Sequence, residues 1–174
     1  MDLRFHPAVE NAASSSILIT GAARSGTTII GKIISTCVNV EYFFEPESLI
    51  CLYASRASVS DSVYKSLYTS LLVEHLGLNS IAGRNLNRNS NDDSAADFVK
   101  DAADLQARLS KSWRRIELLE ELPNHHFAFK IPSILQALPS HALQFPDSKP
   151  IIVTRKPIAI YRSIKSKGWF VDSA

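Results

Sequence analysis

A short apolar segment, residues 16–20 (SILIT), leads into residues 21–28 (GAARSGTT), which combine glycines, hydroxyl side chains and one cation. This pattern predicts a buried strand, a glycine-bounded turn and the first turn of a helix. The free N–H groups of a first helical turn and the positive end of the helix dipole favour an anion. The segment therefore predicts a phosphate-binding loop made by Ala23, Arg24, Ser25, Gly26, Thr27 and Thr28.

The loop differs from that of nucleoside-triphosphate-binding proteins at one position. Gly21 and Gly26 match the spacing of the G-x-x-x-x-G-K-[ST] loop, whose lysine reaches the β- and γ-phosphates. Thr27 stands at the lysine position, and the positive charge has moved to Arg24 inside the loop. The loop therefore predicts a phosphate-like ligand other than ATP. A P-loop nucleotide kinase-like protein with an altered loop is the alternative, and the lack of a strand-end Asp for magnesium counts against it.

Four segments carry a family resemblance. Residues 24–28 (RSGTT) resemble the 5′-phosphosulfate loop of sulfotransferases that use 3′-phosphoadenosine-5′-phosphosulfate (PAPS). Arg155 at the end of an apolar strand, with Ser163 eight residues later, resembles the part of these enzymes that binds the 3′-phosphate. Residues 127–132 (FAFKIP) resemble a strand-Lys-x-Pro element of bacterial and carbohydrate sulfotransferases. Residues 42–46 (YFFEP) resemble an aromatic-Glu-Pro segment of Golgi carbohydrate sulfotransferases.

The resemblance implies an enzyme that transfers a sulfuryl group from PAPS to a hydroxyl or amine of a carbohydrate or another small molecule. The donor product would be adenosine 3′,5′-bisphosphate, and no metal is needed because the donor has no γ-phosphate. The resemblance assigns Arg24 to the leaving 5′-phosphate, and Arg155 and Ser163 to the 3′-phosphate. Glu45 is the candidate general base, and Lys130 a candidate for a role near the donor or acceptor. A module that binds PAPS or the bisphosphate without transfer is the non-enzyme alternative.

Glu45 and Lys130 each have a second interpretation. Glu45 precedes Pro46, which is typical of a first helical turn, so its carboxylate could serve only the helix dipole. Lys130 could be a strand-end lysine that extends to solvent. The five histidines lack metal-ligand spacing, and His125 and His126 are the next candidates for the base.

Composition indicates one domain of ordinary hydrophobicity. The chain has 174 residues and a net charge of +2, without a basic block that would favour nucleic acid or a membrane surface. Cys37 and Cys51 lack metal-ligand spacing and are expected to be buried thiols, which favours a cytoplasmic protein. We expect an N-terminal extension over 1–15 and one α/β sulfotransferase-like domain over 16–174. The resemblance implies that this domain is truncated at its C-terminus. The oligomeric state stays open.

The hydrophobic pattern alternates between strand and helix along the chain. A stripe formed by Ile29, Ile30, Ile33 and Ile34 predicts that the helix after the loop packs against the sheet with these side chains. We expect strands at 16–20, 38–44, 126–130 and 149–154, and further helices at 60–77, 94–110, 111–121, 132–138 and from 157 onward, with an asparagine-rich loop at 79–91. Strands separated by helices predict a P-loop-like parallel sheet with helices on both faces. The loop should lie at the carboxyl ends of the strands, where such sheets bind ligands.

Overall fold

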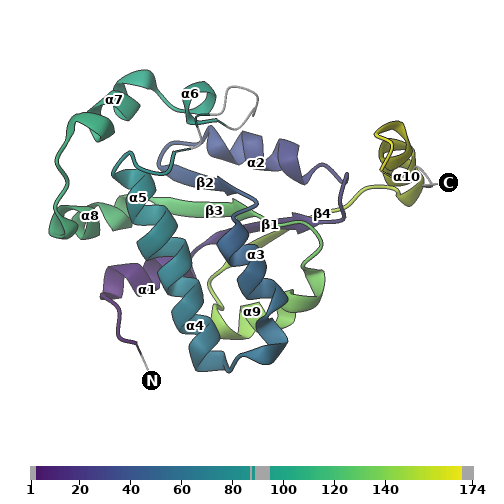
Figure 1. Cartoon of the computed structure of the whole chain (residues 1–174), viewed down its shortest axis with the longest axis horizontal. Helices are drawn as coiled ribbons and strands as arrows, with labels where there is room; N and C mark the ends of the chain where they lie inside the picture. Colours follow the sequence, from purple (N-terminus) through teal and green to yellow (C-terminus); the bar gives the residue numbers. More distant parts are fainter. Residues whose placement is uncertain (1–2, 87, 89–94, 170–174) are drawn as a thin grey trace.

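A sheet of four parallel strands in the order β2-β3-β1-β4 forms the centre of the chain (Figure 1). The computed structural model describes residues 3–86, 88 and 95–169. The strands are β1 (Ile17–Gly21), β2 (Val40–Phe44), β3 (His126–Lys130) and β4 (Lys149–Val153). The four expected strands are confirmed, with ends that differ by at most two residues.

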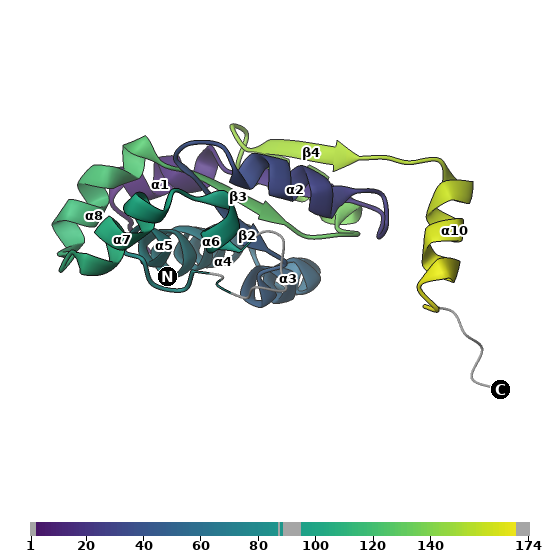
Figure 2. The same cartoon turned by 90° about the horizontal axis from the view of Figure 1, so that it is seen from above.

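Helices cover both faces of the sheet, so the α/β class is confirmed. Helix α2 (Thr27–Ser35) lies on one face and contacts β1, β2 and β3 (Figures 1 and 2). The other face carries α1 (Pro7–Ser14), α3 (Glu47–Ala54), α4 (Asp61–Thr69) and α9 (Leu138–Gln144). The remaining helices are α5 (Leu78–Ile81), α6 (Ala96–Val99), α7 (Ala102–Ser110), α8 (Arg115–Glu121) and α10 (Pro157–Ser166).

Strand β1 lies at the point where the strand order reverses. The chain leaves β1 towards β2 on one side, and the later connection from β3 crosses back past β1 to β4. The segment that follows β1 therefore opens into the crevice between two connections that run in opposite directions. In open α/β sheets, ligands bind at this topological switch point.

The core lies on the face of the sheet opposite α2. Phe127 and Phe129 of β3 are fully buried there, and Tyr64 and Tyr68 of α4 pack with them. Helix α1 lies within the segment expected as an N-terminal extension, and its Val9, Ala12 and Ala13 are part of this core.

His141 of α9 is buried in the same aromatic cluster. Its Nδ1 lies 3.0 Å from the Tyr64 hydroxyl and 3.1 Å from the Tyr53 hydroxyl, and its Nε2 lies 3.1 Å from Ser148 Oγ. Burial lowers the pKa of His141 to about 4, because a charged imidazolium would lose its hydration there.

The expected packing of α2 is wrong for two of its four isoleucines, whereas Ile30 and Ile34 are half-buried. Ile29 and Ile33 are 66% and 58% exposed, whereas Thr27, Gly31 and Ser35 face the sheet. A Cβ on Gly31 would lie 2.1 Å from the Tyr42 hydroxyl oxygen, so the missing side chain lets the helix approach β2 closely. The helix is turned so that its fully buried positions are the small residues.

Several helix boundaries also differ from expectation. Ser60 caps α4 as expected, since its Oγ accepts from the Val63 amide. Gly77 does not end this helix: it has helical backbone angles, and a Cβ there would lie 2.5 Å from the Phe127 ring. The helix continues through a π-helical segment, Ser70–Gly77, into α5. The helix expected at 132–138 begins and ends later: Pro132 lies in a turn, a 3₁₀ helix spans Leu135–Ala137, and α9 begins at Leu138.

The expected helix at 94–110 is divided into α6 and α7, and that at 111–121 is shortened to α8. In the expected loop 79–91, Asn79 belongs to α5, and positions 87 and 89–91 lie outside the described residues, as does position 94.

Among the described residues, no helix combines the length and the apolar character that crossing a membrane requires. Cys37 and Cys51 are free and exposed, so the expectation of buried thiols is wrong. Cys37 follows the end of α2, and Cys51 lies on the outer side of α3.

Candidate functional site

The loop after β1 approaches β4 more closely than a side chain would allow. Gly21 pairs with Val153 of β4 in the parallel sheet, and its φ is +154°. A Cβ on Gly21 would lie 2.2 Å from the Val153 carbonyl oxygen. Glycine at this position therefore fixes the distance between the loop and the C-terminal end of β4.

Two left-handed residues turn the loop back towards α2. Arg24 has φ +65°, and Gly26, the residue that precedes the helix, has φ +111°. The Ser25 amide donates to the Ala22 carbonyl at 3.0 Å, which closes the turn between them. Helix α2 then begins at Thr27, and the amides of its first turn have no acceptors within the helix. The result is a helix N-terminus of the kind that binds anions.

A cavity of about 640 Å³ opens at this helix N-terminus. Its walls come from the loop, from the ends of β2, β3 and β4, and from α10. The expected site residues on these walls are Ala23, Arg24, Gly26, Thr27, Thr28, Glu45, Lys130, Arg155 and Ser163. Segments that are more than 100 residues apart in the sequence thus contribute to one site.

Ser25 is the one expected phosphate-loop residue that does not line the cavity. It is 7% exposed, and its Oγ is buried without a hydrogen-bond partner among the described residues. Its side chain points inward beneath the loop, where a Cβ on Gly21 would lie 2.9 Å from this Oγ. Ser25 therefore reaches a ligand only through its backbone.

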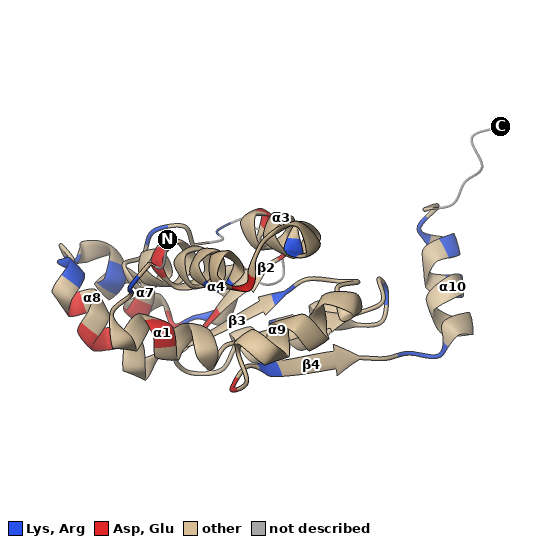
Figure 3. Ribbon diagram, turned by 90° about the horizontal axis from the view of Figure 1, so that it is seen from below, with Lys and Arg blue, Asp and Glu red and all other residues tan. Residues whose placement is uncertain are grey.

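Contacts of Arg24 join the loop to the C-terminal part of the chain. Arg24 Nε donates to Ser163 Oγ of α10 at 3.1 Å, and Arg155 Nη1 donates to the Arg24 carbonyl at 3.2 Å. The Arg24 guanidinium also lies 5.6 Å from the ring centre of Trp169. Residues 154–169 contain five cations and no carboxylate, visible as the blue positions on and before α10 in Figure 3. Of these five cations, Arg155 lines the cavity, together with Arg24 of the loop.

Lys130 and Glu45 form an ion pair on the opposite wall. Lys130 is 4% exposed at the end of β3, and its Nζ also donates to Thr28 Oγ1 at 3.3 Å. The Glu45 amide donates to the Lys130 carbonyl at 3.0 Å, and Glu45 has φ +43°, so the backbone turns sharply after β2. Lys130 therefore does not extend freely to solvent: it connects the first turn of α2 with the Glu45 carboxylate.

Four lining residues were not expected from the sequence: Ile29, Phe44, Pro132 and Trp169. Phe44 belongs to the aromatic run before Glu45, and the Lys130 Nζ lies 4.4 Å from its ring centre. Trp169 gives no signal in the sequence, because only the path of the chain after β4 brings it to Arg24. His125 and His126 do not line this cavity.

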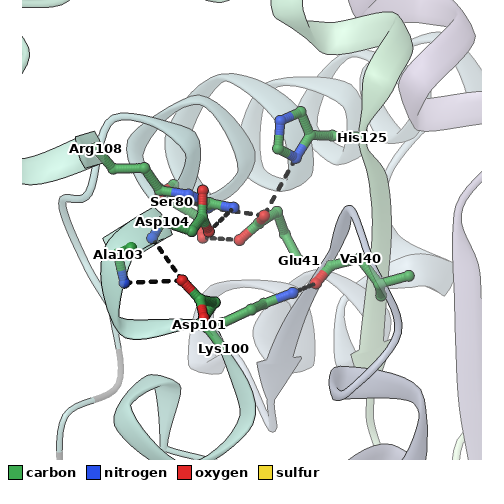
Figure 4. Close-up of polar contacts among 9 residues, drawn as sticks. All are labelled: Val40, Glu41, Ser80, Lys100, Asp101, Ala103, Asp104, Arg108 and His125. Atoms are coloured by element: carbon green, nitrogen blue, oxygen red, sulfur yellow. Dashed lines mark hydrogen bonds and ion pairs between the residues drawn. The ribbon is translucent and has the colours of Figure 1, made fainter. Parts of the chain in front are cut away.

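A buried polar cluster around Glu41 of β2 lies outside this cavity (Figure 4). Glu41 is 2% exposed and accepts from Arg108 Nη1 at 2.8 Å and from Ser80 Oγ at 2.6 Å, and it lies 3.2 Å from His125 Nδ1. Burial alone would raise the pKa of Glu41. The hydrogen bond with His125, the Arg108 charge and the Ser80 hydroxyl outweigh it and lower that pKa to about 2. The buried carboxylate is therefore charged and connects β2 to α5 and α7.

No model of a protein family matches the sequence, and no curated protein or solved structure is significantly similar to it. The interpretation of the site therefore depends on the geometry of the cavity and on the four sequence segments that converge there.

Proposed function

We propose that the cavity binds PAPS and that the protein is a sulfotransferase with a P-loop-like fold of the sulfotransferase type. One observation carries the proposal. Two cations from distant segments, Arg24 and Arg155, line the same cavity as the N-terminus of α2. Their charge and the first-turn amides suit a ligand with two separate anionic groups. The cavity volume is also within the usual range for small-molecule sites.

The two ends of the donor would occupy the two ends of this cavity. The loop amides, Arg24, Thr27 and Thr28 surround the 5′-phosphosulfate, while Arg155 and Ser163 hold the 3′-phosphate. The planar guanidinium of Arg155 suits two-point binding of a terminal phosphate. Because Arg24 Nε now donates to Ser163 Oγ, this contact must open when the two side chains engage separate phosphates. Donor binding would therefore move α10 relative to the loop.

Transfer needs a base for the acceptor and charge stabilisation for the leaving group. Glu45 takes the proton of the acceptor hydroxyl or amine while the acceptor atom forms its bond to sulfur. The bond between sulfur and the phosphate oxygen breaks, and Arg24 stabilises the negative charge that stays on the bisphosphate. Lys130 positions Glu45 through their ion pair and Thr28 through its hydroxyl. The acceptor is a carbohydrate or another small molecule.

A binding module without transfer activity is the second candidate. The observation that favours it is the Lys130–Glu45 ion pair, which engages the carboxylate of the proposed base. We further propose that the protein acts in the cytoplasm, where exposed free thiols such as Cys37 and Cys51 stay reduced.

Thermal unfolding in the presence of nucleotides tests the donor site. Adenosine 3′,5′-bisphosphate at about 100 times its Kd should add about 2.7 kcal/mol to the free energy of unfolding. For a chain of this size that is a rise in Tm of about 5–11 °C. Mg-ATP should raise Tm far less, and equal stabilisation by both ligands would contradict the proposal in favour of the kinase alternative. Transfer of label from ³⁵S-PAPS then separates an enzyme from a binding module.

A further inference from the structure

Helix α10 lies at the edge of the molecule, and none of its residues is fully buried. Ile158 and Tyr161 on this helix are 55% and 56% exposed. Figure 2 shows α10 beyond the end of β4, away from the helices that cover the sheet. An isolated helix of ten residues is only marginally stable in water, so the order of α10 depends on its contacts with the rest of the chain.

Arg24 contacts the chain before, within and after α10. Before the helix, Arg155 Nη1 donates to the Arg24 carbonyl at 3.2 Å. Within the helix, Ser163 Oγ accepts from Arg24 Nε at 3.1 Å. Three residues after the helix, the ring centre of Trp169 lies 5.6 Å from the guanidinium carbon, which is within the range of a cation–π contact. One residue of the loop therefore holds α10 along its whole length.

The guanidinium that holds α10 also lines the cavity at the N-terminus of α2, where an anion is favoured. Among the described residues, no carboxylate oxygen lies within 4.0 Å of the Arg24 nitrogens. The side-chain partners of Arg24 are the Ser163 hydroxyl and the Trp169 ring, and both are neutral. A phosphate or sulfate group binds a guanidinium more strongly than either of them. An anion at α2 therefore competes with α10 for Arg24.

Trp169 can leave Arg24 without disrupting a core. Its side chain lines the cavity beside Arg24, and the residue is 55% exposed, so withdrawal exposes little additional apolar surface. Ser163 and Arg155 would have a new partner after such a change, because both are assigned to the 3′-phosphate. A ligand that lacks this phosphate would offer them none.

We propose that α10 and Trp169 form an autoinhibitory latch on the cavity proposed to bind PAPS. In the closed latch, Ser163 and Trp169 hold the Arg24 guanidinium. An anion at the N-terminus of α2 draws the guanidinium away from both, and the 3′-phosphate then holds α10 through Arg155 and Ser163. A ligand without a 3′-phosphate opens the latch and leaves α10 unattached. This inference rests on the proposed function, because it uses the assignment of the two anionic groups to the two ends of the cavity.

Hydrogen exchange of the α10 amides, followed by mass spectrometry, tests which contacts hold the helix. In the protein alone, Arg24→Met should speed exchange over residues 160–166 by about tenfold, because an unattached helix of this length unfolds readily. Saturating adenosine 5′-phosphosulfate should have the same effect on the wild type. Saturating adenosine 3′,5′-bisphosphate should leave these amides protected. Arg162→Met is the matched control, because Arg162 is an exposed arginine on α10, and it should change the exchange little.

Calorimetry tests whether the latch opposes binding. Trp169→Leu removes one contact that competes for Arg24, so this variant should bind the bisphosphate about 2–5-fold more tightly than the wild type. Trp169→Tyr keeps an aromatic face and should bind nearly as the wild type does. Tyr161→Leu is the matched control, since it makes a similar change at an exposed position of α10, and it should leave the affinity unchanged.

Unchanged exchange in Arg24→Met, or unchanged exchange with the phosphosulfate, would overturn the latch. Weaker binding by Trp169→Leu would also overturn it and would mean that the ring contacts the nucleotide. Failure of the bisphosphate to bind refutes the proposed function, and exchange in Arg24→Met then decides whether Arg24 holds α10. Tight bisphosphate binding that Trp169→Leu does not change refutes the latch alone.

Discussion

Replacing Glu41 by Gln removes one negative charge from the buried cluster that holds β2. The substitution keeps the size of the side chain but leaves Arg108, itself 7% exposed, without its buried carboxylate partner. Loss of one partner of a buried ion pair costs about 3–5 kcal/mol. The pKa of Glu41 gives a second measure, since a decrease from 4.5 to about 2 corresponds to about 3 kcal/mol of stability at neutral pH.

The sign of the pH dependence follows from the direction of this shift. The pKa of Glu41 is lower in the folded than in the unfolded chain, so its contribution is complete above pH 4.5. It decreases as the pH falls through the interval from 4.5 to about 2. The difference between the wild type and Glu41→Gln should therefore be largest at pH 7 and should shrink towards pH 2.

Urea denaturation at several pH values measures this difference in the free energy of unfolding. In thermal unfolding at pH 7, the Tm of Glu41→Gln should be about 6–20 °C below that of the wild type. Glu120→Gln on the exposed side of α8 is the control and should change the free energy of unfolding by less than about 0.5 kcal/mol. Adding Arg108→Met to Glu41→Gln should restore part of the loss, because no unpaired charge then stays buried. A loss below about 1 kcal/mol at pH 7, or one that does not depend on pH, would refute the role assigned to the cluster.

Three further predictions concern the cavity proposed to bind PAPS and the core. Glu45→Gln should lower the rate of sulfuryl transfer by about 10²–10⁴-fold and leave the bisphosphate affinity almost unchanged, whereas Arg24→Ala should lower both. Steady-state kinetics measures the rate, and calorimetry measures the affinity. Normal turnover of Glu45→Gln would place the base elsewhere. Arg155→Ala should weaken bisphosphate binding by about 2–4 kcal/mol and hardly change the binding of adenosine 5′-phosphosulfate, which lacks the 3′-phosphate. Equal losses of affinity for both nucleotides would mean that Arg155 acts only through its hydrogen bond to the Arg24 carbonyl. The folded-state pKa of His141 is below its unfolded value, so urea denaturation should show stability falling by about 3 kcal/mol from pH 6.5 to 4. His141→Gln should flatten this slope, and an unchanged slope would assign it to other groups.

The strand, tight turn and helix start around residues 17–27 could be predicted from the sequence because their signals are local. Gly21, Arg24 and Gly26 lie within six residues, and the strand and helix beside them follow from the adjoining apolar pattern. Arg155 and Ser163 could be placed near the loop only through the family resemblance. The structure brings them to the same cavity through the parallel pairing of β4 with β1.

The failures come from contacts between distant segments. A Gly after an apolar stripe usually ends a helix, but Gly77 keeps helical backbone angles, and a glycine is needed there because Phe127 occupies the space of a side chain. The isoleucine stripe of α2 is similar: close contact between Gly31 and Tyr42 decides which side of the helix meets the sheet. Glu41 could have been noticed as a carboxylate inside an apolar strand, but its partner Arg108 is 67 residues away.

The most direct test of the nucleotide site is a titration of the ¹⁵N-labelled protein with adenosine 3′,5′-bisphosphate, followed by amide NMR. The proposal predicts saturable shifts at residues 21–28 and at Lys130, Arg155 and Ser163, all in one binding event. Amides of the Glu41 cluster, such as that of Arg108, should change little. Mg-ATP at the same concentration should leave these signals nearly unchanged. Shifts confined to the loop, or the same shifts with both nucleotides, would contradict the claim that the distant segments form one site for PAPS.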